Sequence, residues 1–162
     1  MNLAEYEPYF IQWSSLTEEQ RDLFFIGDEY LPLPDSHADR IKVLIGAEAR
    51  SFMGEALHAV PGYSSAATSI FVQEKFISTA DVWTDEAKVQ AVRDWLYHTG
   101  VPFSRRVFLL YDRLVVSTDW KIVVKYWDAF AWSVGVATLI LDESKTWVCR
   151  FDHEDVITFS SY

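Results

Sequence analysis

Histidine is the residue of this chain that most readily binds a metal ion, and its spacing favours no metal site. The four histidines are His37, His58, His98 and His153, and no two lie four residues apart, as they would on one helix face. A zinc site needs about four converging ligands. The segment His153-Glu154-Asp155 could supply one or two of them. We therefore expect no metal ion and no other cofactor.

The candidate nucleophiles are equally weak. Gly62-Tyr63-Ser64-Ser65-Ala66 resembles a nucleophile elbow, but that motif needs a strand before the serine and a helix after it. Here we expect the reverse order. Cys149 alternates with Trp147 and Phe151, which is typical of a small core thiol. The acids show no spacing that singles out a catalytic pair, so we expect no enzyme and name no catalytic residue.

The distribution of charge favours a protein partner. The net charge is −10, and the first forty residues carry nine acids against two bases. An excess of this sign argues against binding nucleic acid or an anionic membrane, and it could steer a basic protein partner. The alternative is a solvated surface that keeps the protein soluble. The candidate partner-binding residues are Glu18, Glu19, Asp22, Asp28, Glu29 and Asp35, and, in two expected turns, Asp112, Arg113, His153 and Glu154.

The expected compartment is the cytoplasm. A single cysteine cannot form an internal disulfide. The first five residues include one acid and no base, so they show no basic region of a secretory signal. No apolar run approaches the roughly 18 residues that a membrane helix needs.

Four segments carry helix signals, within a length that predicts a single domain over residues 1–162. Thr17 and Gln20 fit a capping box, which predicts a short helix running toward Gly27. A second helix start lies near Asp35. It is followed by a long apolar stripe, and the predicted helix ends at Pro61. The third helix is predicted from its cap at Thr84 to Gly100. The fourth segment, 120–130, fits either a helix or a strand, and Thr118 as cap with Asp119 in the first turn favours the helix.

The remaining segments are rich in β-branched and aromatic residues and predict strands. Two pairs of them flank short turns and predict hairpins, one around Asp112-Arg113 and one around residues 142–145. The fold class is therefore α+β, with N-terminal helices followed by a mostly antiparallel sheet with an inserted aromatic helix. The predicted strands are 68–77, 106–111, 114–117, 136–141, 146–151 and 156–159.

Aromatic residues are unusually dense, with seven Trp and eleven Phe in 162 residues. Tyr126, Trp127, Phe130 and Trp132 lie within seven positions. They predict either an aromatic-rich core or exposed anchors of a protein interface. The sequence leaves both alternatives open.

Residues 106–162 resemble small bacterial immunity proteins of contact-dependent or type VI toxin systems. The resemblance rests on the strand Val107–Asp112, on Thr118-Asp119-Trp120, on Lys125–Phe130, on the hairpin that ends in Trp147, and on Phe151–Asp155 with Phe159. It implies a non-enzymatic protein that binds and neutralises a cognate toxin, and an acidic inhibitor would suit a basic, nuclease-type effector. It carries over no binding residue, because such families bind through variable surfaces. The alternatives are an adaptor domain of a phage or secretion assembly, and an enzyme with an unrecognised carboxylate or histidine site.

Overall fold

One antiparallel sheet runs through the whole molecule. The computed structural model describes residues 3–21, 33–60, 73–132, 137–152 and 154–161. Within them, eight strands pair in the order β1-β2-β5-β4-β6-β7-β8-β3, and every neighbouring pair is antiparallel. The strands are β1 (Ile11–Gln12), β2 (Lys42–Ile45), β3 (Gln73–Ser78), β4 (Arg106–Leu110), β5 (Leu114–Asp119), β6 (Thr138–Leu141), β7 (Trp147–Asp152) and β8 (Val156–Ser161).

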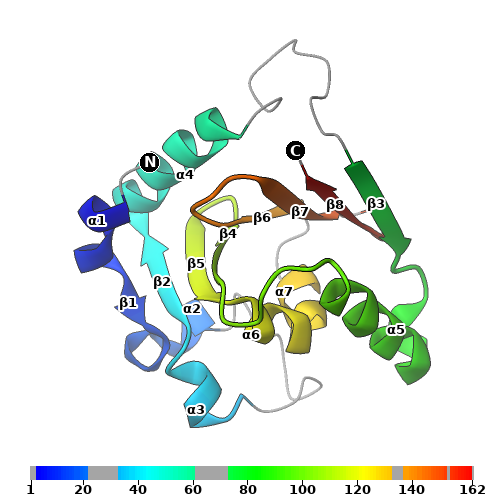
Figure 1. Cartoon of the computed structure of the whole chain (residues 1–162). Coiled ribbons are helices and arrows are strands. Elements are labelled where there is room, and N and C mark those ends of the chain that lie inside the picture. Colours follow the sequence, from blue (N-terminus) through cyan, green and yellow to red (C-terminus); the bar gives the residue numbers. More distant parts are fainter. Residues whose placement is uncertain (1–2, 22–32, 61–72, 133–136, 153, 162) are drawn as a thin grey trace.

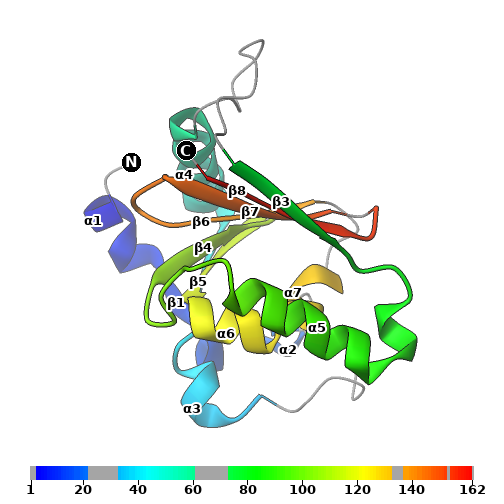
Figure 2. The same ribbon diagram turned by 45° about the vertical axis from the view of Figure 1, so that its right-hand side comes forward.

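Helices cover both faces of this sheet, as Figures 1 and 2 show. Helices α1 and α4 lie on one face, and α5, α6 and α7 lie on the other. The predicted α+β class is confirmed. The helices are α1 (Leu3–Tyr6), α2 (Glu18–Arg21), α3 (Asp35–Ala38), α4 (Gly46–Ala59), α5 (Glu86–Tyr97), α6 (Trp120–Lys125) and α7 (Trp127–Trp132), with short 3₁₀ helices η1 (Glu7–Tyr9), η2 (Trp13–Ser15) and η3 (Val82–Thr84).

Each face of the sheet has its own apolar core. Under α4, the ring of Phe52 packs edge-on against Tyr6 at 5.2 Å and also contacts Phe108 at 5.1 Å. On the other face, Trp120 packs against Trp147 at 5.5 Å within a larger cluster that includes most of the buried aromatic residues. The dense aromatics therefore belong mainly to the core.

The prediction of one long helix from Asp35 to Pro61 is wrong. The chain forms the short α3, then β2, and only then α4. Val43 and Leu44 are both buried but in different cores, because successive residues of a strand point to opposite faces of the sheet. A short apolar run fits either element, and pairing with β5, which lies more than sixty residues further along the chain, selects the strand.

The aromatic segment after β5 is helical, as predicted. It forms α6 and α7, with a break at Tyr126. Trp120, Val123, Val124 and Trp127 are all buried, so the predicted helix phase is confirmed. The caps are shifted by one residue from the prediction, to Asp119 for α6 and to Asp85 for α5.

Both predicted hairpins are confirmed, and so is the last strand. The predicted strand 68–77 appears as β3 over its described part. Segment 62–66, with the serines of the elbow-like motif, lies outside the described residues. The strands β1 and β2 were not predicted.

Candidate protein-binding surfaces

The predicted acidic residues that the structure describes in the N-terminal region are exposed. Glu18 and Glu19 lie on α2 and Asp35 begins α3. The predicted capping box is present: the amide of Thr17 donates to the side chain of Gln20 at 2.9 Å, and the amide of Gln20 donates to the Thr17 hydroxyl at 3.2 Å. The candidates Asp22, Asp28 and Glu29 lie outside the described residues.

The candidates in the C-terminal turns lie at the other end of the sheet. Asp112 and Arg113 form an exposed ion pair at 3.6 Å in the β4–β5 turn, and Glu154 is exposed in the β7–β8 turn. The two turns lie at the same end of the sheet, because Leu110, Leu139 and Arg150 align across β4, β6 and β7. His153 lies outside the described residues.

The six candidates that the structure describes therefore do not form a single surface. Helix α3 leads into the start of β2, and α2 follows the end of β1. Lys42, at the start of β2, pairs with both Gln12 and Ser117, far along β5 from the β4–β5 turn. The N-terminal acids thus adjoin one end of the sheet, and the two C-terminal turns adjoin the opposite end.

A cleft that the sequence did not reveal opens at the first of these ends. It has a volume of about 340 Å³ and lies between the loop that follows α5, the β6–β7 turn and the ends of β3 and β8. Its apolar part includes Trp147 and Phe159, whose rings stack at 5.4 Å. Lys75 and Arg105 place positive charge in its lining.

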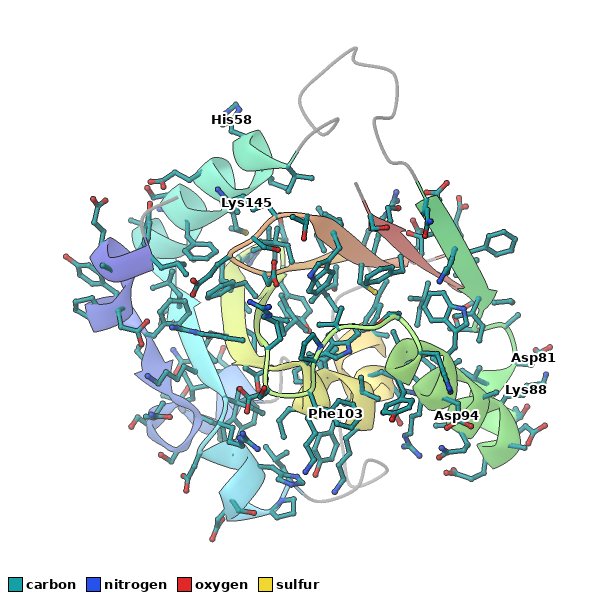
Figure 3. The ribbon with its side chains drawn as sticks, viewed as in Figure 1. His58, Asp81, Lys88, Asp94, Phe103 and Lys145 are labelled. Carbon is teal, nitrogen blue, oxygen red and sulfur yellow. The ribbon has the colours of Figure 1, made fainter. Side chains whose placement is uncertain are left out.

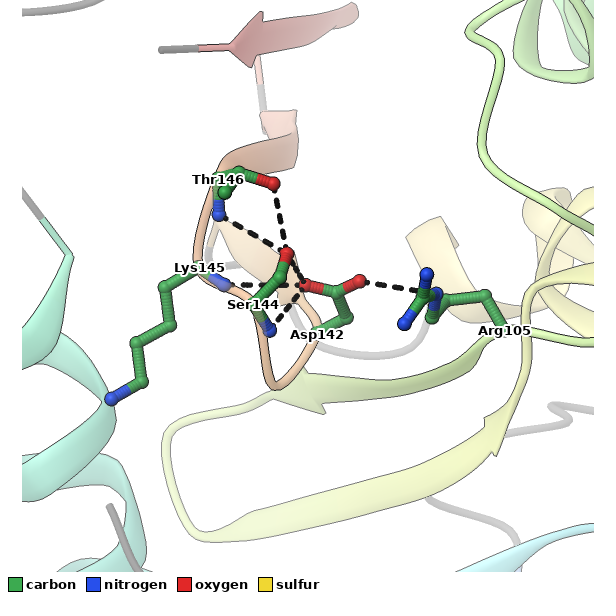
Figure 4. Close-up of polar contacts among 5 residues, drawn as sticks. All are labelled: Arg105, Asp142, Ser144, Lys145 and Thr146. Atoms are coloured by element: carbon green, nitrogen blue, oxygen red, sulfur yellow. Dashed lines mark hydrogen bonds and ion pairs between the residues drawn. The ribbon is translucent and has the colours of Figure 1, made fainter.

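The carboxylate of Asp142 contacts Arg105 in this cleft (Figure 4). One carboxylate oxygen of Asp142 faces Arg105 Nε at 3.4 Å. The other oxygen accepts hydrogen bonds from the Ser144 amide at 2.9 Å, the Ser144 hydroxyl at 2.5 Å and the Lys145 amide at 3.3 Å. The carboxylate is almost fully buried, so the guanidinium and the turn together compensate for its burial.

This arrangement suits binding better than nucleophilic catalysis. The Ser144 hydroxyl already donates its proton to Asp142, and a carboxylate occupied by a guanidinium and three turn donors is a poor general base. Among the described residues that line the cleft there is no histidine to take that role. Arg105, held by its Nε, can turn its terminal nitrogens toward an incoming acceptor.

An exposed aromatic pair lies beside the cleft. Tyr97 at the end of α5 is 55% exposed and Phe103 in the following loop is 41% exposed, with ring centroids 5.3 Å apart. The loop residues between them, 99–102, line the cleft itself. Figure 3 shows Phe103 below the ribbon of this loop. The apolar spacing of α5 is a signal that could have predicted an exposed Tyr97, because Tyr97 lies off the buried stripe formed by Val89, Val92 and Leu96.

In the described ranges, no group of three or more histidine, cysteine or acidic side chains is placed to hold a metal ion. No helix within those ranges is long and apolar enough to cross a membrane.

No protein-family model matches the sequence. No curated protein is significantly similar to it.

Proposed function

We propose that this chain is an immunity protein, which binds a cognate bacterial toxin in the cytoplasm and neutralises it without catalysis. The observation that carries the proposal is the exposed pair Tyr97 and Phe103 beside the cleft of Arg105. Tyrosine and arginine are enriched among the residues that dominate binding energy at protein interfaces. The resemblance of residues 106–162 to immunity proteins supports the same function.

In this proposal the aromatic pair and the cleft act together. The rings of Tyr97 and Phe103 cover an apolar part of the toxin, and the cleft accepts one of its polar side chains. Asp142 holds Arg105 in place before the partner arrives, which reduces the side-chain entropy lost on binding. The exposed acids Glu18, Glu19 and Asp35 adjoin the same end of the sheet and steer a basic toxin toward it.

The test starts from the reading frames that neighbour this gene, because toxin and immunity genes commonly lie side by side. Each neighbour is expressed in a bacterial host with and without this chain. We expect one of them to stop growth and this chain to restore it through a direct complex. A complex without toxicity would favour the alternative, an adaptor domain of a phage or secretion assembly.

The surface is tested with the double variant Tyr97→Ala/Phe103→Ala. Loss of two hot-spot aromatics should weaken the complex by roughly 30-fold or more. Tyr9→Ala is the matched control, because Tyr9 is 54% exposed on η1, which lies outside the cleft lining. If the double variant binds as tightly as the parent and the control, this surface does not contact the toxin.

A further inference from the structure

The two edges of the sheet are unequal. The edge strand β1 has only two residues, and short edge strands protect a sheet against pairing with another chain. The other edge strand, β3, has six residues and pairs with β8 alone within the described part of the chain. Figure 1 shows β3 at the outer margin of the sheet. The edge of β3 therefore offers backbone groups to a further strand.

The direction of these backbone groups follows from one hydrogen bond. The amide of Thr79 donates to the carbonyl of Asp155 across the β3–β8 pair, at 2.7 Å. Successive residues of a strand direct their amide and carbonyl groups alternately to either side. Gln73, Lys75 and Ile77 therefore bond to β8, while residues 74, 76 and 78 direct theirs outward.

Phe76 lies in the middle of these outward-directed residues and is 73% exposed. Its neighbour across the sheet is Thr158, which in turn pairs with the exposed Arg150. Phe76 therefore stands beside small and polar side chains rather than under a helix. An exposed phenylalanine on an edge strand that has a single partner within the described fold marks a site for strand pairing.

We propose that β3 pairs antiparallel with β3 of a second copy of this chain, across a two-fold axis centred on Phe76. In that register residue 76 faces residue 76 of the second copy, and residue 74 faces residue 78. All three outward-directed residues then form hydrogen-bonded pairs, and the two Phe76 rings lie side by side. This inference is independent of the proposed function.

The charges of β3 favour this register over two neighbouring ones. A pairing centred on Lys75 would place two lysines directly opposite each other, and one centred on Glu74 would oppose two glutamates. Like charges directly opposite each other on paired strands are unfavourable. The pairing centred on Phe76 instead sets Lys75 against Ile77 and Glu74 against Ser78, so no like charges meet.

Oxidative cross-linking tests the register, because the native Cys149 is buried and leaves the surface free of thiols among the described residues. In Phe76→Cys the two introduced residues have Cα atoms about 5.5 Å apart, within the reach of a disulfide. With a mild added oxidant, the two thiols give up two protons and two electrons and the dimer is trapped. We expect this variant to cross-link almost completely.

Two variants serve as controls. In Lys75→Cys the two introduced residues lie diagonally across the strand pair, with Cα atoms roughly 7–8 Å apart. This distance exceeds the usual span of a disulfide, so little cross-link should form. Tyr9→Cys measures the background from random collisions. Cross-linking of Lys75→Cys in preference to Phe76→Cys would overturn the register, and equal yields in all three would overturn the proposal.

Sedimentation of the purified parent protein tests the dimer itself. Such a small interface gives a weak, concentration-dependent dimer. Phe76→Asp places two carboxylates opposite each other and should weaken dimerisation at least tenfold. A parent protein that stays monomeric at all accessible concentrations, or a dimer that Phe76→Asp leaves intact, would overturn the proposal.

Discussion

The thiol of Cys149 on β7 is fully buried, as its alternation with Trp147 and Phe151 predicts. Its neighbours across the strands are Ile140 and Phe159. Burial in apolar surroundings raises the pKa of this thiol well above its usual range, so the reactive thiolate hardly forms.

We predict that Cys149 reacts with a thiol reagent at least about 1000-fold more slowly in the native protein than in urea, because reaction requires unfolding. The measurement is the labelling rate under both conditions, with Tyr9→Cys as an exposed control in the same fold. Fast native labelling of Cys149 would show an open path to the thiol.

The ring of His37 on α3 is a second residue whose environment controls its titration. Its Nδ1 lies 2.7 Å from the Tyr126 hydroxyl. Burial, followed by the positive charges of Lys125, Lys121 and Arg40, lowers the pKa of His37 below its ordinary value of 6.5. The folded protein therefore disfavours the protonated ring.

This shift predicts a loss of stability in mild acid. Between the lowered folded pKa and the unfolded value near 6.5, the unfolded chain binds more protons. The contribution of His37 to the free energy of unfolding is complete above a pH of about 6.5. It falls as the pH decreases from that value toward the lowered pKa of the folded protein. The free energy of unfolding, measured with urea from pH 5 to 8, should therefore depend less on pH in His37→Gln than in the parent. If the free energy of unfolding depended equally on pH in both proteins, His37 would not be the cause of the acid sensitivity.

Trp127 on helix α7 links the larger core to α5. Trp127 is fully buried, and its indole Nε1 donates to the carbonyl of Val89 at 3.3 Å. We predict that Trp127→Ala lowers the free energy of unfolding by about 3–5 kcal/mol, because it leaves a large cavity. Trp127→Phe loses the hydrogen bond and less volume, and should cost about 1–2 kcal/mol. Urea unfolding measures both, and a cost below about 1 kcal/mol for the alanine variant would mean that the core closes over the site.

The elements that the sequence predicts correctly are those determined by neighbouring residues. The hairpins around Asp112-Arg113 and around residues 142–145 join strands only a few residues apart. The helix phase of Trp120 and Trp127 follows from spacing alone. By contrast, β2 forms because Val43 pairs with Val116, and no local pattern records such a distant partner. The order of the eight strands is non-local for the same reason.

The candidate surface was harder to predict than the fold. Charge predicted acidic candidates at Glu18, Glu19 and Asp35, and they are exposed. The cleft of Arg105 and Asp142 is assembled from segments on either side of α6 and α7, so sequence spacing gives no sign of it. Likewise, Phe76 resembles a core residue until the sheet order places β3 at an edge.

Over the whole molecule, the two described groups of candidate charges lie at opposite ends of the sheet. Variants at one end can therefore serve as controls for variants at the other when electrostatic steering of the toxin is tested. If a basic toxin approaches the end with the cleft, the variant Glu18→Gln/Glu19→Gln/Asp35→Asn should slow association several-fold at low salt. It should also reduce the salt dependence of the association rate, while dissociation and thermal stability hardly change.

Asp112→Asn/Glu154→Gln is the matched variant at the other end of the sheet, and its association rate should equal that of the parent. Stopped-flow or surface-based kinetics at low and high salt measure these rates. If both variants show the parent's salt dependence, the acids serve solubility alone.

The position of β3 in the sheet also dictates when it can fold during synthesis. Its partner is β8, in which Ile157 pairs with Ile77, so the partner is made roughly 80 residues later, or some 4–16 s at ordinary translation rates. Until then Phe76 and the whole of β3 have no strand on either side within the described fold. A nascent chain on the ribosome thus carries an unpaired strand for seconds, which makes this segment a natural place for a chaperone to bind and for a stalled chain to aggregate.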